Sequence, residues 1–234
     1  MSIVNAVLIG FSNNYFYGFN RFFKYQDNMI QMLLQLNTAM IHVISTSANL
    51  DNNFEMRKQQ YIAGLESIKH YYRMDPYIIE GARATDYLGE HFVSEAQHSA
   101  NKSNNEIITI ANFFREYAHG FQDSDYIIKT TLRYELYSSC FLDYIKDNPG
   151  YDAYGKYSSD IYGAGDINIH TFLFCMTYRC WQEFLSGHFD PNTHPDYPTE
   201  TQVSAYLRTQ NTRYVDQLGI IARPWNHHPR IYNT

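Results

Sequence analysis

The chain of 234 residues carries 24 acidic and 18 basic side chains, a formal net charge of -6. Clustered lysine and arginine are needed to bind phosphate backbones, so this charge excludes a nucleic-acid polymer as the main partner. Hydrophobic residues make up 44% of the chain. We predict a single domain over residues 1–234, with an N-terminal helical arm at 1–24 and a trunk at 25–234.

The first segment has an apolar stripe with helical spacing. Its members recur at three- and four-residue steps and include Val4, Val7, Leu8, Phe11, Tyr15 and Phe19. A terminal element is easily projected, so the stripe packs either on its own domain or on a neighbouring molecule. No Lys or Arg precedes this apolar run, and a bilayer span takes about 20 apolar residues. We therefore expect a soluble cytosolic protein with no membrane partner.

The next segments alternate between strand and helix patterns. The stretch TAMIHVISTS at 38–47 is β-branched and predicts a strand. Residues 53–73 place Tyr61, Leu65, Ile68 and Tyr72 on one face and predict a helix that ends before Asp75-Pro76. The stretches EIITIANFF, YIIKTTLRYELYS and CFLDYI are rich in β-branched and aromatic residues. We interpret these three as antiparallel strands.

Two more helices are predicted towards the C-terminus. Asp166 is a candidate N-cap for a buried helix through INIHTFLFCMTYRCWQEFLS, with Gly187 at its end. A last helix is expected around residues 203–218. The three cysteines, Cys140, Cys175 and Cys180, are too few for a disulfide framework, which favours a reducing compartment.

No catalytic motif occurs in the sequence. It contains no P-loop, no G-x-G-x-x-G, no G-x-S-x-G elbow and no H-E-x-x-H helix. Arg115 and His119 are interpreted as a structural pair. A metal site built from His188, His194, His227 and His228 is conceivable, but no Asp, Glu or Cys lies at a familiar ligand spacing. We assign no catalytic residue and no metal ligand.

Tyrosine is in excess, with 22 residues, and four lie in the polar stretch GYDAYGKYSSDIYGAGD at 150–166. These four are Tyr151, Tyr154, Tyr157 and Tyr162. Phenols suit contacts between folded surfaces, and they become anions near their pKa of about 10. We hypothesise that the four are assembly contacts and an alkaline switch, while composition alone equally allows the excess to fill a core.

Several stretches resemble the cypovirus polyhedrins. FCMTYRCWQEFLSGHFDPNTHPDYP at 174–198 is similar to their C-terminal helix and following loop, and QQYIAGLESIKHYYR at 59–73 to another of their helices. RYEL at 133–136 and Asn148-Pro149 with Tyr151 look like pieces of their strand region, in the same order. The resemblance implies an α+β fold: an antiparallel β-sandwich trunk with flanking helices and a projecting N-terminal helix.

The resemblance also implies a function. Cypovirus polyhedrins are non-enzymatic matrix proteins that form homotrimers and crystals in the cytoplasm of infected cells. These occlusion bodies enclose virions, contact a virion surface protein and dissolve in alkali. Some members hold nucleotides, so a bound nucleotide is compatible with the resemblance. The N-terminal stripe and the four tyrosines would then be lattice or trimer contacts.

Two other classes remain open at this point. One is an accessory subunit of a large cellular complex, which would need unlike partners. The other is a small metal-dependent hydrolase or ribonuclease that uses His119 or the loop histidines His188, His194, His227 and His228.

Overall fold

The computed structural model describes residues 39–48, 54–94, 102–158, 168–192, 199–222 and 230–231. All of them belong to the second of two units into which the chain divides, Ala39–Thr234. The N-terminal stripe from Val4 to Phe19 and Tyr162 lie outside the described residues. No helix of the described part is long and apolar enough to cross a membrane.

Helices and strands alternate along the described residues. The helices are α2 (Phe54–Tyr72), α3 (Lys102–Tyr117), the 3-10 turn η2 (Ala118–Gly120), α4 (Cys140–Asp147), α5 (Tyr178–Gly187) and α6 (Thr199–Leu207). The strands are β1 (Ile41–Ser47), β2 (Tyr77–Glu80), β3 (Phe92–Val93), β4 (Tyr126–Thr131), β5 (Glu135–Leu136), β6 (Ala153–Gly155), β7 (Tyr157–Ser158), β8 (Asn168–Ile169), β9 (Leu173–Thr177), β10 (Thr212–Tyr214), β11 (Ile220–Ala222) and β12 (Arg230–Ile231).

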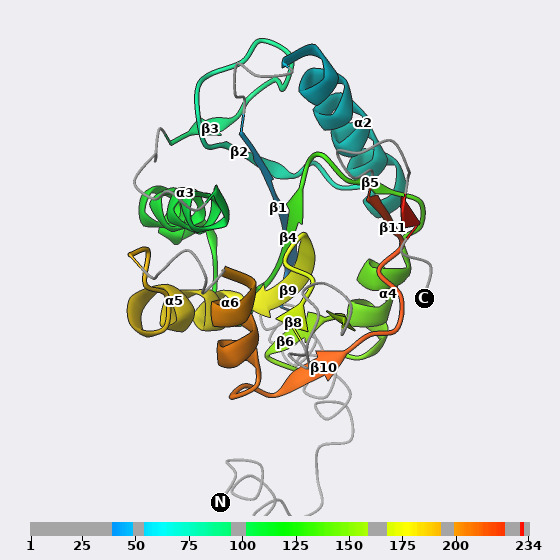
Figure 1. Cartoon of the computed structure of the whole chain (residues 1–234). Coiled ribbons are helices and arrows are strands. Elements are labelled where there is room, and N and C mark those ends of the chain that lie inside the picture. The colour runs from blue at the N-terminus through cyan, green and yellow to red at the C-terminus, as the bar shows by residue number, and fades with distance from the viewer. Residues whose placement is uncertain are drawn as a thin grey trace, which may run out of the picture. The chain divides into compact units, whose positions relative to one another are not determined.

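A seven-stranded mixed sheet in the order β10-β6-β9-β4-β1-β2-β3 forms the centre (Figure 1). The neighbours β3, β2, β1 and β4 are parallel, whereas β9 is antiparallel to both β4 and β6. The chain leaves β1 for β2 on one side and returns through α3 to β4 on the other side. The strand order therefore reverses between β1 and β4, where open α/β sheets form a crevice outside the carboxyl ends of their strands.

Helices cover both faces of this sheet. Successive strand residues point to opposite faces, so Val43 and Ile128 pack in the core under α2 and α4, and Ile44 and Ile127 in the core under α3, α5 and α6. Figure 1 shows the two groups of helices on opposite sides of the sheet. Each fully buried aliphatic side chain contributes about 1.5–3 kcal/mol. The sheet is thus a rigid support for its loops.

The predicted antiparallel β-sandwich is wrong, because the central sheet is mostly parallel and has helices on both faces. Several local predictions are confirmed. The strand over 41–47 and the helix over 54–72 are present, and helix α5 ends at Gly187 as expected. The run 126–131 is a strand as predicted, and it pairs parallel with β1 and antiparallel with β9. The predicted α+β sandwich is therefore wrong in the direction of the strand pairs of the central sheet, most of which are parallel.

Two segments predicted as strands are helical. EIITIANFF lies within α3, where Ile107, Ile110, Phe113 and Phe114 are buried in a single core. Their three- and four-residue spacing gives a helix a buried face, and this outweighs the β propensity of the isoleucines. CFLDYI forms most of α4, again with a one-sided set of buried residues.

The buried helix predicted from Asp166 onwards is only half correct. Residues 173–177 form the central strand β9, in which every residue is buried. A strand covered on both faces is apolar throughout, so its sequence also fits a helical period. The helix begins after Thr177, whose side chain accepts a hydrogen bond from the Cys180 amide.

Candidate functional site

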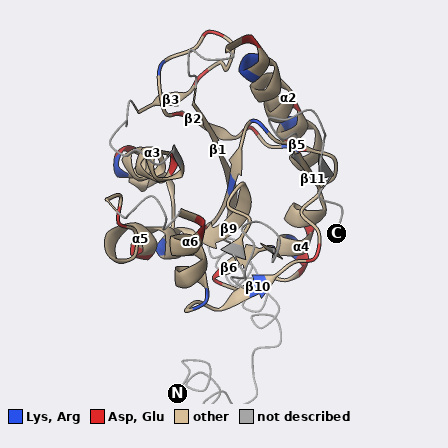
Figure 2. Cartoon of the chain, viewed as in Figure 1, with Lys and Arg blue, Asp and Glu red and all other residues tan. Residues whose placement is uncertain are grey.

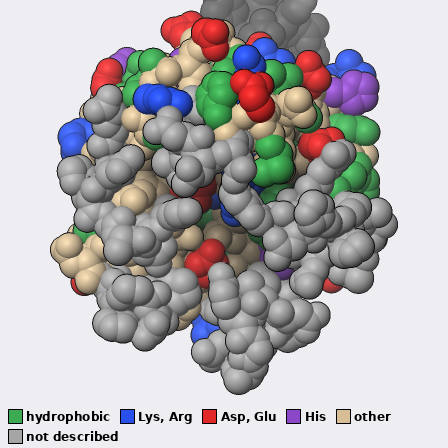
Figure 3. Space-filling model, turned by 45° about the horizontal axis from the view of Figure 1, so that its top comes forward, with side chains coloured by type: hydrophobic (Ala, Val, Ile, Leu, Met, Phe, Trp, Pro, Cys, Tyr) green, Lys and Arg blue, Asp and Glu red, His purple; other side chains and the backbone are tan. Residues whose placement is uncertain are grey.

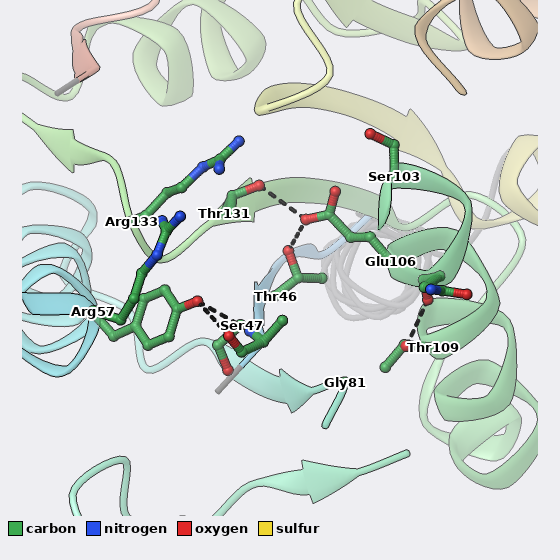
Figure 4. Close-up of a pocket in the computed structure, with 12 residues that line it drawn as sticks. Thr46, Ser47, Arg57, Gly81, Ser103, Glu106, Thr109, Thr131 and Arg133 are labelled. Carbon is green, nitrogen blue, oxygen red and sulfur yellow. Dashed lines mark hydrogen bonds between the residues drawn. The ribbon is translucent and has the colours of Figure 1, made fainter. Parts of the chain in front are cut away.

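A cavity of about 440 Å³ opens at the carboxyl ends of β1, β2 and β4 (Figure 4). Its lining residues are Thr46, Ser47, Ala48, Arg57, Tyr61, Gly81, Ser103, Asn105, Glu106, Thr109, Thr131 and Arg133. Most of these are polar, whereas the strands that lead to them are apolar. The volume lies within the range of small-molecule sites, about 300–1,000 Å³. The cavity coincides with the reversal of strand order, which makes it the candidate site.

Glu106 of α3 joins the two central strands at the cavity. Its Oε1 accepts hydrogen bonds from the hydroxyl of Thr46 at the end of β1 and, at 2.9 Å, from that of Thr131 at the end of β4. The Lys129 ammonium lies 2.9 Å from the same oxygen. The Lys129 side chain is only 1% exposed and that of Glu106 is 24% exposed. The two form a shielded ion pair in the cavity wall.

The ion pair is held in its charged form. Burial opposes ionisation of Glu106, but the adjacent Lys129 ammonium and the hydrogen bonds from Thr46 and Lys129 outweigh it and lower the Glu106 pKa. Burial also lowers the pKa of Lys129, and the Glu106 carboxylate raises it back only in part. Glu106 is therefore a carboxylate at neutral pH and a weak base.

Two arginines bring positive charge to the opposite wall. Arg57 comes from α2 and Arg133 from the segment after β4, and Figure 4 shows both guanidinium groups extending into the same space across from α3. Arg57 donates to Gln60 at 3.4 Å, and the Arg133 guanidinium carbon lies 4.9 Å from the Tyr134 ring centre. In Figure 2 charged residues lie mainly on helices and loops, with a basic position inside the sheet on β4.

The ends of β1 and β2 are fixed by buried polar groups. Tyr61 accepts from the Ala48 amide at 3.1 Å and donates to its carbonyl at 3.0 Å, which ties the end of β1 to α2. Buried Glu80 accepts from the Ser47 hydroxyl at 2.5 Å and from the Ala82 amide at 3.0 Å. These bonds shape the turn around Gly81.

Figure 3, in which the top of Figure 1 comes forward, shows both signs of charge near the centre of that face.

Replacing Gly64 by alanine is expected to destabilise the protein and displace α2 from the site. A Cβ at this position would lie 1.8 Å from the Leu132 carbonyl oxygen, and backbone cannot yield as a side chain can. Overpacking of this kind costs about 2 kcal/mol. Urea denaturation measures the loss. Gly187→Ala, where a Cβ meets nothing within 4 Å, is the matched control, and an equal loss in both variants would contradict the close approach of α2.

A second cavity of about 200 Å³ adjoins the first. It is lined by Ser103, Glu106, Lys129, Thr131, Arg133, Tyr134, His170, Thr171, Phe172 and Glu200. Lys129 also donates to the Thr171 carbonyl at 2.8 Å, so the buried ammonium connects the Glu106 carboxylate with the loop before β9. The two cavities therefore share a wall that is built around this ion pair.

We expect His170, in the second cavity, to make stability sensitive to mild acid. Burial, helped by the charge of Lys156, lowers the His170 pKa from its usual 6.5 to about 4. Between these values the unfolded chain binds a proton that the folded chain does not, so stability is full above about pH 6.5 and falls towards pH 4 by about 2–3 kcal/mol. Urea denaturation at several pH values measures this. His170→Asn should lose this part of the pH dependence, and an unchanged slope would contradict the assignment.

The structure places three of the four predicted tyrosines, and none of them lines either cavity. Tyr154 is fully buried, donates to the Asn148 carbonyl at 2.6 Å, and burial raises its pKa, so it is neither a surface contact nor a switch near pH 10. Tyr151 packs against it, and the Tyr157 hydroxyl lies 2.8 Å from that of Tyr214. An assembly role for Tyr151 and Tyr157 stays a prediction.

The histidines of the alternative enzyme hypothesis are not gathered in the described part. His119 lies in η2 and His188 follows α5, and neither lines the two cavities described above, while His194, His227 and His228 lie outside the described residues. Among the described residues no group of three or more His, Cys, Asp or Glu side chains could hold a metal ion.

None of the residues that line the cavity was predicted as a site residue from the sequence. Thr46, Thr131 and Arg133 lie at or just after the ends of buried strands, which is where parallel sheets place their ligands. This signal was present in IHVISTS and YIIKTTLR. The signal indicates a site only in a parallel sheet, and these strands were predicted to be antiparallel.

The fold has counterparts among solved structures, although no protein family and no curated protein matches the sequence. A protein of Bacillus anthracis, assigned as a glucose-1-phosphate thymidylyltransferase and solved with a sucrose, is 10% identical, with a TM-score of 0.50 over 77% of this chain and 89% of that chain. A glycosyltransferase involved in glycosylation of the PBCV-1 major capsid is 11% identical, with a TM-score of 0.45 over 75% and 80%. The galactosyltransferase LgtC, with donor and acceptor sugar analogs, is 9% identical, with a TM-score of 0.43 over 76% and 73%.

At 10% identity the first of these likenesses shows the fold alone. The fold is a Rossmann-like α/β architecture, and it contradicts the resemblance to cypovirus polyhedrins. The predicted occlusion-body matrix function, and with it the expectation of a non-enzymatic protein, rested on that resemblance and is wrong.

Proposed function

We propose that the protein is a sugar-transferring enzyme whose larger cavity binds a nucleoside diphosphate sugar. The observation that carries the proposal is the pair of arginines, Arg57 and Arg133, which face one polar cavity at the reversal of strand order. The fold shared with the thymidylyltransferase-assigned protein supports this class. In this proposal the bound nucleotide is part of the donor substrate.

The charge of a diphosphate matches the arginine side of the cavity. A guanidinium group presents paired donors whose geometry fits phosphate oxygens, and such charge-assisted hydrogen bonds are among the strong ones. The opposite wall includes Ser103 and Asn105 from the first turns of α3. The amino end of a helix carries partial positive charge and favours phosphate. Anion binding is thus supported from two sides.

The remaining polar groups suit the hydroxyl groups of ribose and sugar. The hydroxyls of Ser47 and Thr109 and the phenol of Tyr61 also lie in the lining. Hydroxyl side chains both donate and accept, so they adapt to the alcohol groups of a ligand.

The ionised carboxylate of Glu106 has a role in such a transfer. The bond between the sugar C1 and the diphosphate oxygen breaks with its electron pair on the diphosphate, while an acceptor oxygen bonds to C1 and loses its proton. Cleavage at C1 passes through a transition state with positive charge on the sugar. A fixed carboxylate near that charge stabilises it without reorganising. The Glu106 pKa, lowered by Lys129, suits this electrostatic role better than that of a base.

The proposal is tested by ligand binding and by donor turnover. The full chain is incubated with UDP-glucose, UDP-galactose, UDP-N-acetylglucosamine, dTDP-glucose and GDP-mannose, each with and without Mg²⁺ or Mn²⁺. We expect at least one donor to stabilise the folded protein, by about 2.7 kcal/mol when its concentration is a hundred times Kd. This stabilisation is observed as a higher melting temperature. The released nucleoside diphosphate is followed by mass spectrometry. No stabilisation and no release with any donor would overturn the proposal.

A second candidate is nucleotidyl transfer, favoured by the likeness to the thymidylyltransferase-assigned protein. Such an enzyme would form a nucleotide sugar and pyrophosphate from a nucleoside triphosphate and a sugar 1-phosphate. Incubation with dTTP or UTP and glucose 1-phosphate distinguishes the two. Pyrophosphate release would favour nucleotidyl transfer, and nucleoside diphosphate release from a nucleotide sugar would favour glycosyl transfer.

A further inference from the structure

The smaller cavity adjoins the proposed donor cavity. The two share Ser103, Glu106, Thr131 and Arg133. Ligands in the two cavities would therefore both lie against Glu106. Two ligands that react with each other need this arrangement, because reacting atoms have to be held close together in a fixed orientation.

The lining of the smaller cavity combines ring faces with polar groups. Tyr134 and Phe172 pack with ring centres 4.9 Å apart, and beside them lie Thr171 and Glu200. A sugar ring has an apolar C–H face that packs on aromatic rings, and hydroxyls that bind carboxylates and hydroxyl groups. About 200 Å³ is roughly half the volume of the donor cavity. This composition fits a small polar ring better than a lipid or a second nucleotide.

We propose that the smaller cavity binds the acceptor, a saccharide whose terminal ring lies against Tyr134 and Phe172. This rests on the proposed sugar transfer in the larger cavity. The acceptor hydroxyl faces the shared wall, and its oxygen forms the bond to C1 of the donor sugar. The proton of that hydroxyl goes to Glu200, the carboxylate of this cavity that is not paired with Lys129. The electron pair of the broken bond leaves with the nucleoside diphosphate.

Glu200 is connected through Thr171 to Lys129, the residue that forms the ion pair with Glu106. The Thr171 hydroxyl donates to Glu200 at 3.2 Å, and Lys129 donates to the Thr171 carbonyl at 2.8 Å. One buried ammonium thus positions both carboxylates, one for the positive charge at C1 and one for the proton. The division of labour between two carboxylates in different surroundings is a common arrangement in acid–base chemistry.

Saturation-transfer NMR with simple sugars tests the acceptor site separately from the donor site. The probes are methyl α-D-glucopyranoside and methyl β-D-galactopyranoside, and UDP reports on the larger cavity. The proteins are wild type, Phe172→Leu, Glu200→Gln and Arg57→Gln, with Glu66→Gln as the matched control on the exposed face of α2. Circular dichroism checks that each variant is folded.

We expect at least one glycoside to bind the wild type and to bind about tenfold more weakly in Phe172→Leu and Glu200→Gln, with UDP binding unchanged. Arg57→Gln should bind UDP more weakly and the glycoside unchanged. Glu66→Gln should bind both as the wild type does. With a donor that turns over, Glu200→Gln should also lose the acid limb of the pH–rate profile for transfer. Absence of glycoside binding, or equal binding in all variants, overturns the acceptor site. If the wild-type protein does not bind UDP, the proposed function is overturned instead.

Discussion

Glu106→Gln is expected to lower the free energy of unfolding by about 4 kcal/mol, because it leaves the Lys129 ammonium buried without a carboxylate. The same change removes the negative charge from the wall that both cavities share. We therefore also expect a loss of transfer by about a hundredfold or more, the effect of removing one transition-state contact. Urea denaturation gives the first quantity and initial rates give the second.

The double variant Glu106→Gln/Lys129→Met separates the two effects. Replacing both members of a buried ion pair is often neutral for stability, so the double variant should recover most of the lost free energy. It should not recover transfer, because the carboxylate is still absent. Glu66→Gln, an exposed charge loss on α2, should change stability by at most about 0.5 kcal/mol. A double variant as unstable as the single one would contradict the ion pair.

Nucleotide binding should weaken by about 10–100-fold in Arg57→Gln and in Arg133→Gln, and by more when the two are combined. Each change removes a charge-assisted contact to the diphosphate, worth about 1.5–3 kcal/mol. Calorimetric titration with UDP measures the effect. Because phosphate contacts are electrostatic, the wild-type affinity should also fall as salt is raised.

Arg115→Gln is the matched control for these substitutions. Arg115 lies on α3, donates to Asn112 at 3.1 Å and lines neither cavity. It should bind UDP with the wild-type affinity. Equal weakening in Arg115→Gln and Arg57→Gln would mean that general charge, and not the cavity, attracts the nucleotide.

Individual elements could be predicted where burial is one-sided. Helix α2 has charges opposite its buried face, so its period is visible in the sequence. Strand β1 was recognised from its β-branched residues. Strand β9 and helix α3 were misassigned, since β9 is buried on both faces and α3 carries isoleucines that favour strands in isolation. These errors turned a parallel sheet into an antiparallel one.

The candidate site depended on the strand pairing. Thr46 and Thr131 are 85 residues apart in the chain and are brought together only because β1 and β4 are parallel neighbours, in the register Thr46 opposite Thr131. Glu106 reaches them from a helix that sequence patterns presented as a strand. A polar residue after an apolar strand could have been noticed, but its partners could not be named without the topology.

The most direct test is a crystal structure of the full chain with the nucleotide sugar that stabilises it most. We expect the diphosphate to lie in the larger cavity, within hydrogen-bond distance of the Arg57 and Arg133 guanidinium groups, and the sugar to point towards Glu106. Density for the nucleotide at any other place on the protein, with this cavity holding only water, would contradict the proposed function.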